Sequence, residues 1–180
     1  MLHSRAVALK KLGFTHFYGE TGMSDLPISI AQLSDIHFYE ASDGIVDNYR
    51  HSMNCLKKIQ TALEVDKPDC LIITGDITNI GDKLSLERIY QWIQDKIYVD
   101  GDYYGLQCKE RDIQVILVPG NHDAFNAPSH GNNLKRWQSS LSNFYSVFHQ
   151  HRFPDGESVD YVWLTKGKTN LFVCRVDSCY

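Results

Sequence analysis

No stretch of the chain is apolar over the roughly 18 residues that a membrane-spanning helix requires. The first residues also lack the apolar segment of a signal peptide, because Lys10, Lys11 and His16 interrupt them. The five cysteines are odd in number and widely scattered, and none forms a CxxC pair. This argues against a disulfide framework and against a thiolate zinc site. We therefore expect a cytoplasmic protein with reduced thiols and no membrane span.

The chain also lacks a basic stripe of the kind that holds nucleic acid by its phosphates, since 18 Lys and Arg residues stand against 22 Asp and Glu residues and the net charge is −4. An extended polynucleotide is thus a disfavoured partner. The 180 residues, 43% of them hydrophobic, are long enough for one domain with a sizeable core. We expect a partly disordered leader segment over residues 1–27, with a short amphipathic helix, and one domain over residues 28–180.

Three apolar runs rich in β-branched residues predict strands that are buried on both faces. The runs are Ile28–His37, Cys70–Asp76 and Ile113–Val118. Between them, apolar residues spaced three and four apart predict helices over Asn48–Val65 and Ser85–Tyr98. The resulting β-α-β-α-β order predicts an α/β fold with a parallel sheet and right-handed crossovers.

Two further elements are expected after the third strand. Apolar residues at helical spacing predict a helix from Asn132 to about His149. The sequence TKGKTN then separates two alternating runs, Val159–Leu164 and Leu171–Val176, and predicts an antiparallel hairpin. Residues 100–111, rich in Gly and Tyr, are expected to form a linker.

Each predicted strand of the parallel sheet ends in side chains that suit a divalent metal ion. Asp35 and His37 are two residues apart, so on an extended backbone both side chains point the same way. Asp76 follows a glycine and has two oxygens that can bridge two cations, and Asn121 offers a neutral carbonyl oxygen. His122 directly follows Asn121 and is expected to face the substrate, where an imidazole can stabilise or protonate a leaving oxygen.

This set of donors indicates phosphate ester hydrolysis. Two divalent ions about 3.5–4 Å apart lower the pKa of a bridging water and hold both the attacking and the leaving oxygen of a displacement at phosphorus. Carboxylate, amide and imidazole ligands accept Mn, Fe or Zn, so the identity of the two ions stays open. The expected partner is a small phosphodiester or phosphomonoester.

Three short motifs support a resemblance to a known family. SDIH (residues 34–37), GDITN (residues 75–79) and GNHD (residues 120–123) resemble the first three signature blocks of the calcineurin-like metallophosphoesterase family. The resemblance covers about residues 28–177 and implies a layered αββα sandwich, of which this chain holds the first sheet and the beginning of the second. Because no arginine occurs between Ile73 and Glu87, the second motif is more similar to the cyclic-nucleotide phosphodiesterase branch than to the protein Ser/Thr phosphatases.

The resemblance also implies a role for each matching residue. Asp35 and His37 would bind the first metal ion, Asp76 would bridge the two ions, and Asn121 would bind the second. His122 would be the catalytic imidazole. The implied activity is hydrolysis of a phosphate ester by a hydroxide that bridges a dinuclear metal centre.

The chain departs from the family pattern at two points. Asn79 stands where many members have an aspartate that pairs with the catalytic histidine, and its amide oxygen is expected to orient His122. The later lone-histidine and GHxH blocks do not occur. The His149 and His151 pair is expected to lie at a solvated helix end rather than at the metals, because residues two apart on a helix face apart.

These departures leave alternatives open. The chain is either the amino-terminal portion of a working hydrolase or a catalytically impaired remnant that acts as an interaction module, with a nuclease of the same superfamily as a further alternative. We expect weak catalysis, since three imidazoles of the pattern are missing. We also expect an open apolar sheet face that favours self-association or binding of a carboxyl-terminal partner segment.

Overall fold

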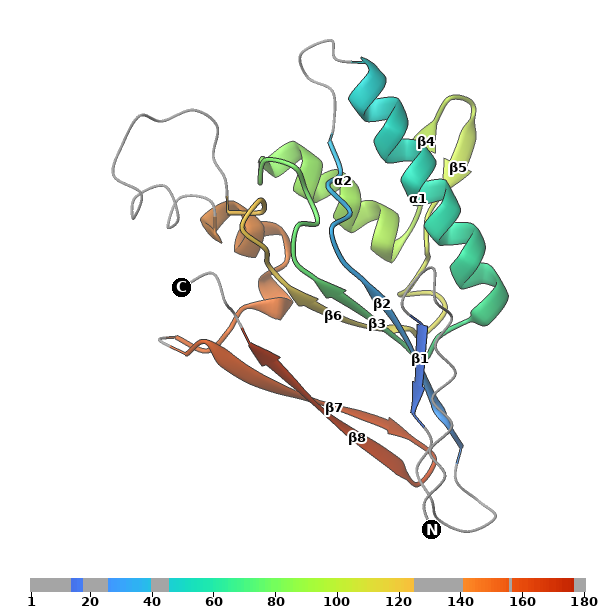
Figure 1. Ribbon diagram of the computed structural model, residues 1–180, viewed down its shortest axis with the longest axis vertical. Helices are drawn as coiled ribbons and strands as arrows, with labels where there is room; N and C mark the ends of the chain where they lie inside the picture. Colours follow the sequence, from blue (N-terminus) through green and yellow to red (C-terminus); the bar gives the residue numbers. More distant parts are fainter. Residues whose placement is uncertain (1–13, 18–25, 40–45, 125–140, 156, 177–180) are drawn as a thin grey trace.

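The first sheet lies at the centre of the molecule. A computed structural model describes residues 14–17, 26–39, 46–124, 141–155 and 157–176. Within them, four strands form one sheet in the order β1-β2-β3-β6 (Figure 1). The last three are parallel neighbours, and β1 pairs antiparallel with β2. The strands are β1 (Phe14–Phe17), β2 (Ile28–Leu33), β3 (Cys70–Thr74) and β6 (Gln114–Val118).

Two helices connect the parallel strands and cover one face of this sheet (Figure 1). α1 (Val46–Asp66) links β2 to β3, and α2 (Lys83–Gln94) lies between β3 and β6. Asp82 caps α2 by accepting a hydrogen bond from the backbone N–H of Ser85. Apolar residues at helical spacing turn towards the sheet on both helices and are buried. They are Met53, Leu56, Ile59 and Leu63 on α1, and Leu86, Ile89, Trp92 and Ile93 on α2.

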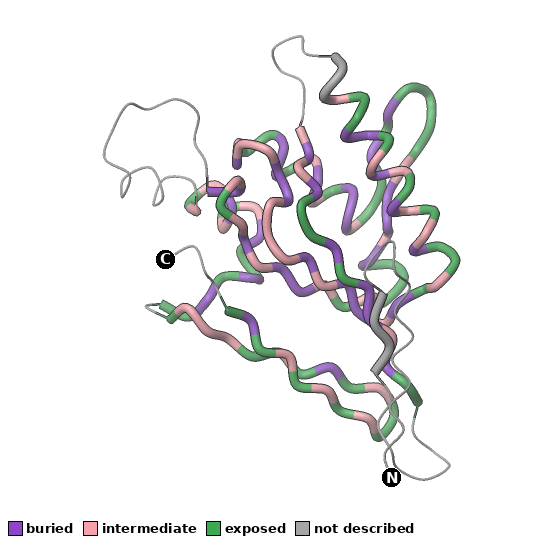
Figure 2. The backbone as a smooth tube through the Cα atoms, in the orientation of Figure 1, coloured by how far each residue is buried: buried purple, intermediate pink, exposed green. Residues whose placement is uncertain are grey.

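A long hairpin covers the opposite face of the sheet. β7 (Val159–Lys166) and β8 (Thr169–Val176) pair antiparallel around a turn with Gly167. Leu164 packs with Ile28, Ile30, Cys70 and Ile116 of the first sheet in a second buried cluster. Lys166 also forms an ion pair of 2.8 Å with Asp69. The described residues thus form three layers, with buried positions concentrated on the central sheet (Figure 2).

These layers confirm the expected mixed α/β fold with a parallel sheet flanked by helices. The sequence predicts one element incorrectly, because α2 ends at Gln94 and Tyr98 belongs to β4 (Ile97–Val99). This strand pairs with β5 (Asp102–Tyr104) within the segment expected as a linker. Asp100 and Gly101 both have positive φ, and an Asp-Gly pair of this kind favours a tight hairpin turn.

Two other regions differ from the sequence-based expectations. Residues 14–17 lie inside the expected leader, yet they form β1; the rest of residues 1–25 is outside the described part. Of the expected helix after Asn132, residues 141–147 are helical and a 3₁₀ turn, His149–His151, follows; residues 125–140 are not described. No described helix has the length and apolar character needed to cross a bilayer.

His151 is buried, which contradicts its expected place at a solvated helix end. Its ring lies 6.4 Å from the ring of Phe148, centroid to centroid. Burial lowers the pKa of His151 to about 4, and electrostatic repulsion from the nearby Arg175 and from His149 adds to this effect. The imidazole is therefore a neutral core group at neutral pH.

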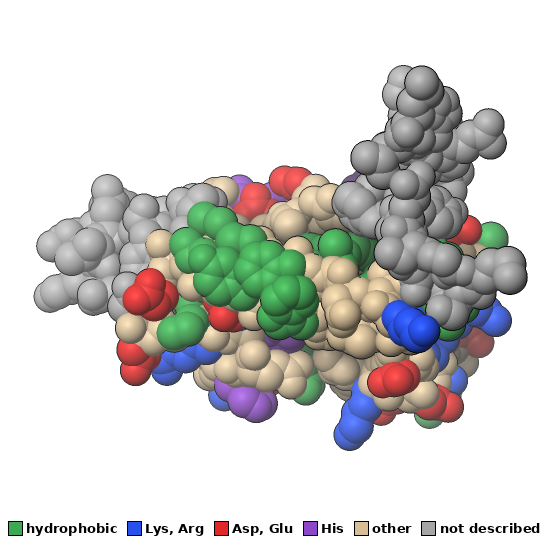
Figure 3. Space-filling model, turned by 90° about the horizontal axis from the view of Figure 1, so that it is seen from below, with side chains coloured by type: hydrophobic (Ala, Val, Ile, Leu, Met, Phe, Trp, Pro, Cys, Tyr) green, Lys and Arg blue, Asp and Glu red, His purple; other side chains and the backbone are tan. Residues whose placement is uncertain are grey.

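The hairpin β7–β8 has an unusual distribution of polarity. The charged residues of its two strands, Asp160, Lys166 and Arg175, form ion pairs with partners in or beneath the hairpin, and Lys168 lies exposed in the turn. Arg175 is buried and donates to the backbone carbonyls of Leu117 and His151. Large apolar side chains face outward instead, and they gather on the side of the molecule that Figure 3 shows.

Candidate metal centre

The three parallel strands bring the three sequence motifs together at one edge of the sheet. Parallel strands place their carboxyl ends at the same edge, where open α/β sheets bind ligands. Backbone hydrogen bonds then join the loops that follow the strands: the N–H of Gly75 donates to the carbonyl of Val118 (2.8 Å), and the N–H of His37 donates to the carbonyl of Asp76 (2.9 Å). The side chains that follow β2, β3 and β6 therefore have fixed relative positions.

Three of the predicted residues form one compact group. His37, Asp76 and His122 each offer a ligand atom, and these atoms lie within 4.8 Å of one another. Nε2 of His37 is 3.9 Å from a carboxylate oxygen of Asp76, and the His37 and His122 rings meet edge to face with centroids 4.7 Å apart. Two imidazoles and a carboxylate suit a divalent transition metal ion.

The local chemistry of His37 also fits a bound ion. Its Nδ1 is buried and has no hydrogen bond partner among the described residues. The side chain as a whole is 38% exposed, and an unpaired buried ring nitrogen is unusual in a folded protein. The donor set and this unsatisfied ring together make the group a candidate metal centre.

The other two predicted ligands lie at the border of this group. A carboxylate oxygen of Asp35 is 4.0 Å from Nε2 of His37, and the side chain is 67% exposed. Asn121 is exposed as well and directly precedes His122 in the chain. Asp35 is thus adjacent to the three-residue group, while Asn121 is placed next to it by the backbone.

The backbone at the site is left-handed rather than extended. Asp35, His37 and Asp76 have φ values of 54°, 48° and 45°, and Gly75 has 77°. The expectation that Asp35 and His37 share a direction on an extended strand is therefore wrong, because β2 ends at Leu33. Left-handed conformations of non-glycine residues cost roughly 1–2 kcal/mol each and are often found at functional sites.

His122 is oriented by a backbone carbonyl. Its Nδ1 lies 2.9 Å from the carbonyl oxygen of Asn79, so this nitrogen carries the proton and donates. In the neutral ring, Nε2 is then an acceptor that can bind a metal ion or take a proton. The sequence predicts that the amide side chain of Asn79 orients His122, whereas in the structure the backbone carbonyl of the same residue accepts this hydrogen bond.

His122 also lies on the metal side of the site. The sequence predicts that this ring faces the substrate, because the predicted metal ligand Asn121 directly precedes it. The structure groups it with His37 and Asp76, and its backbone N–H donates to a carboxylate oxygen of Asp76 at 2.9 Å. The ring would therefore be in reach of a metal ion held by this group.

Asp123 joins two of the loops from below the site. Its carboxylate is fully buried and accepts hydrogen bonds from the backbone N–H groups of Ile77 (3.1 Å), Thr78 (2.7 Å) and Gly120 (3.0 Å). The hydroxyl of Thr78 donates as well, at 3.0 Å. Burial raises the pKa of Asp123, and the hydrogen bonds from these N–H groups oppose the rise. Asp123 therefore fixes the loops relative to one another.

Thr78 and Gly81 are the residues that the sequence analysis misses. The hydroxyl of Thr78 also accepts a hydrogen bond from the N–H of Gly81 at 3.0 Å. Gly81 has a φ of 62°, and a Cβ atom there would lie 2.2 Å from the carbonyl oxygen of Asp123. Thr78 stands inside the second motif and Gly81 two residues after it, but their contact with a residue more than forty positions away was not visible in the sequence.

Gly120 allows the closest approach between two loops at the site. A Cβ atom on Gly120 would lie 2.2 Å from the backbone nitrogen of Asp76 and 2.3 Å from its carboxylate oxygen. We therefore predict that Gly120→Ala displaces Asp76 and lowers Mn²⁺ affinity by about 10- to 100-fold, the range seen when residues that support metal ligands are lost. Isothermal titration calorimetry measures this change.

The matched control for this substitution is Gly105→Ala. A Cβ atom there would lie 1.8 Å from the carbonyl oxygen of Asp95, outside the site. Both substitutions are expected to lower the free energy of unfolding by about 1–3 kcal/mol through overpacking. Equal losses of Mn²⁺ affinity in the two variants would contradict a specific role of Gly120.

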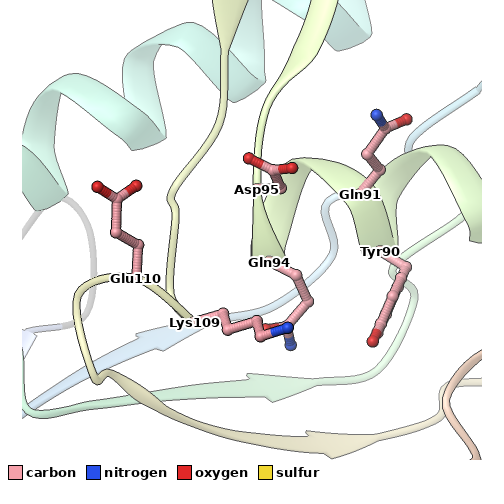
Figure 4. Close-up of a pocket in the computed structure, with 6 residues that line it drawn as sticks. All are labelled: Tyr90, Gln91, Gln94, Asp95, Lys109 and Glu110. Atoms are coloured by element: carbon pink, nitrogen blue, oxygen red, sulfur yellow. The ribbon is translucent and has the colours of Figure 1, made fainter.

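A separate surface hollow of about 540 Å³ lies at a different edge of the molecule (Figure 4). It is formed by the carboxyl-terminal half of α2 and by the loop that precedes β6. That loop enters β6 at its amino end, opposite to the candidate metal centre. The lining residues are Tyr90, Gln91, Gln94, Asp95, Lys109 and Glu110.

The fold and the three-residue group define a class of protein: a layered α/β protein with a candidate metal centre at the carboxyl edge of its parallel sheet. Residues 28–175 match the family described as calcineurin-like phosphoesterase, and the chain belongs to this family. Family membership confirms the resemblance carried by the three motifs.

Two curated relatives share part of the chain. A probable cyclic nucleotide phosphodiesterase from Synechococcus sp. is 27% identical over 103 residues, which cover 54% of this chain and 32% of the relative. A probable cyclic nucleotide phosphodiesterase from Vesicomyosocius okutanii is 30% identical over 100 residues, which cover 53% of this chain and 33% of the relative. The matched part of the chain thus spans about a third of the length of these relatives.

Proposed function

We propose that the protein is a metal-dependent hydrolase of phosphate esters that uses two divalent metal ions. The observation that carries this proposal is the convergence of His37, Asp76 and His122 within 4.8 Å at the carboxyl edge of the sheet. His37, Asp76 and the adjacent Asp35 would hold one ion, and Asp76 and Asn121 the other. When bound, such ions lower the pKa of a water molecule and neutralise the charge of a phosphate group.

The residues of the chain then position the substrate and move the proton. His122 keeps its proton on Nδ1 by donating to the Asn79 carbonyl, so Nε2 is the nitrogen that is available to a substrate or a metal ion. In its protonated state, Nε2 can donate to the oxygen that leaves phosphorus. A backbone carbonyl orients the ring but stabilises its positive charge less than a carboxylate does, so we expect slow turnover.

Small phosphodiesters, and cyclic nucleotides in particular, are the substrate class that we propose. Both relatives are named probable cyclic nucleotide phosphodiesterases. The net charge of −4 gives no support for binding a long polyanion. We also propose a cytoplasmic location, in keeping with the scattered, odd number of cysteines.

The test combines metal binding with hydrolysis by the purified chain. We expect calorimetry to detect Mn²⁺ binding. Mn²⁺ should also support slow hydrolysis of bis(p-nitrophenyl) phosphate and of a 3′,5′-cyclic nucleotide. A chelator should abolish the hydrolysis of both substrates, and added Mn²⁺ should restore it. Preparations of Asp155→Asn serve as the control, because this carboxylate is 93% exposed on the surface and pairs only with the exposed Arg152 in the described structure. Its activity should equal that of the wild type.

Two outcomes would count against the proposal. Absence of stoichiometric Mn²⁺, Fe²⁺ and Zn²⁺ binding would exclude a metal centre in the chain. Metal binding without hydrolysis of either diester would favour the alternative of an interaction module, for which the exposed apolar face of β7–β8 is the specific structural support.

A further inference from the structure

Arg175, near the end of β8, joins the hairpin to the first sheet from a buried position. Only 4% of its side chain is exposed, and its guanidinium pairs with Asp160 of β7. The same group donates to the backbone carbonyls of Leu117 (3.2 Å) and His151 (2.9 Å). Its Cζ also lies 4.8 Å from the centre of the Phe153 ring. A buried cation needs such partners in place of water, so the guanidinium fork fixes their relative positions.

The contact with Leu117 reaches the strand that leads to the candidate metal centre. The carboxyl ends of β6 and β8 lie on the same side of the molecule (Figure 1). At the end of β6, the carbonyl of Val118 accepts the N–H of Gly75 at 2.8 Å, on the side of β3. Successive carbonyls of a strand point to opposite sides, so the carbonyl of Leu117 points away from β3 and towards Arg175. The end of β6 is thus held from both sides.

The loop after β6 passes a shift of this strand end on to the metal centre. Only Pro119, whose ring fixes φ, separates the end of β6 from Gly120. Gly120 packs directly on the loop after β3, since a Cβ atom there would lie 2.2 Å from the backbone nitrogen of Asp76. The backbone N–H of His122 donates to the Asp76 carboxylate at 2.9 Å. A displacement of the end of β6 therefore moves residues that would hold the metal ion.

We propose that Arg175 is a positioning residue that couples the β7–β8 hairpin to the candidate metal centre. By holding the end of β6, it keeps Gly120 and His122 in the arrangement that binds the ion. This proposal rests on the proposed function, because metal binding is the property that Arg175 supports. Coupling of this kind is reciprocal: if the position of the hairpin favours metal binding, bound metal must favour that position of the hairpin equally.

Arg175→Lys tests the geometry of the contact while it keeps the charge. The lysine places a positive charge beside Asp160, but its donors radiate from one point and cannot hold a carboxylate and two carbonyls as a planar fork does. We expect calorimetry on the full chain to show Mn²⁺ affinity lowered by about 3- to 30-fold, the range for coupling through a contact network. Asp160→Asn weakens the same network from β7 and should lower the affinity by a smaller factor. It carries the test where Arg175→Lys does not fold.

Hydrogen exchange followed by mass spectrometry separates coupling from a general loss of stability. In the first minutes of labelling, exchange reports local opening rather than global unfolding. In the wild type, saturating Mn²⁺ should slow exchange in residues 159–176 as well as in residues 119–124. In Arg175→Lys, the protection of residues 159–176 by Mn²⁺ should fall by at least about half. A purely structural role of Arg175 would instead speed exchange over the whole chain, with or without the ion.

Arg152→Lys is the matched control. It makes the same substitution beside His151, but the Arg152 side chain is 64% exposed and pairs with the exposed Asp155. Its Mn²⁺ affinity and its exchange pattern should equal those of the wild type.

Three results would overturn the proposal. Wild-type Mn²⁺ affinity in both network variants would show that the end of β6 is held without Arg175. Protection by Mn²⁺ confined to residues 119–124 of the wild type would show that the hairpin is not coupled to the ion. The third result comes from the metal-free protein, where Arg175→Lys should speed exchange in residues 119–124 at least about threefold more than in α2. An equal change in both segments would exclude the positioning role.

The metal-free comparison also separates the two proposals. If the wild type binds no Mn²⁺, the proposed function fails. The exchange of residues 119–124 in metal-free Arg175→Lys then still decides whether Arg175 positions the loop after β6.

Discussion

Replacing Asp76 with asparagine is expected to lower Mn²⁺ affinity and Mn²⁺-dependent diester hydrolysis by at least about a hundredfold. Loss of a residue that only supports a metal ligand already costs about 10- to 100-fold, and Asp76 is proposed as a ligand itself. Asp76 is the carboxylate of the three-residue group, and it lies 3.9 Å from Nε2 of His37. An asparagine keeps the shape of the side chain and an oxygen that can accept from the N–H of His122. The substitution therefore removes the negative charge and leaves the loop contacts in place.

The measurements for Asp76→Asn are calorimetric titration with Mn²⁺ and the rate of bis(p-nitrophenyl) phosphate hydrolysis. Its thermal unfolding temperature without metal should stay within a few degrees of that of the wild type, because no hydrogen bond is lost. Asp155→Asn again controls for the change of net charge. Wild-type affinity in Asp76→Asn would exclude this carboxylate as a ligand and would remove the basis of the proposed metal centre.

Replacing Asp123 with alanine is expected to lower the free energy of unfolding by about 3–5 kcal/mol. The carboxylate accepts four hydrogen bonds, three from backbone N–H groups and one from the Thr78 hydroxyl, all in buried surroundings. Removing it leaves these donors unsatisfied, and each such group retains its desolvation cost. Urea denaturation at pH 7 measures the loss.

Thr78→Val gives a graded comparison. It removes one of the four donors to Asp123 and the acceptor for the N–H of Gly81, so the expected loss is about 1–2 kcal/mol. Both variants should also bind Mn²⁺ more weakly under conditions where they are folded, since Asp123 links the loop of Asp76 to the loop of His122. A loss below about 1 kcal/mol in Asp123→Ala would show that the carboxylate is not the main tie between the loops.

Much of the fold follows from local patterns in the sequence. The three parallel strands, the buried stripes of α1 and α2 and the hairpin β7–β8 are predicted from apolar periodicity, and the structure confirms them. The small hairpin β4–β5 is missed because strands of three residues are too short to show a period. Its only local signal is the Asp100-Gly101 pair, which sits in a segment that otherwise resembles a linker.

Much of the candidate site also follows from the order of the motifs. Strand ends at one edge of a parallel sheet must meet, so the meeting of the loops that carry His37, Asp76 and His122 follows from the motif order, whereas the direction of the His122 ring does not. The conformation of the loops does not follow either, since Asp and His tolerate left-handed φ values better than most residues but adopt them at only a minority of positions. The orienting role of Asn79 falls to its main chain for the same reason, because the loop path decides which oxygen reaches His122.

The amino-acid sequence by itself determined the order of the three parallel strands and their two helices, the family and the choice of candidate metal ligands, because these depend on residue type and on spacing along the chain. Only the tertiary structure decided that Asp123 ties two loops together, that His151 is a buried neutral group and that the hairpin turns its aromatic residues outward. These properties arise from contacts between residues distant in the sequence. Their energies depend on burial and on the partners that burial brings together.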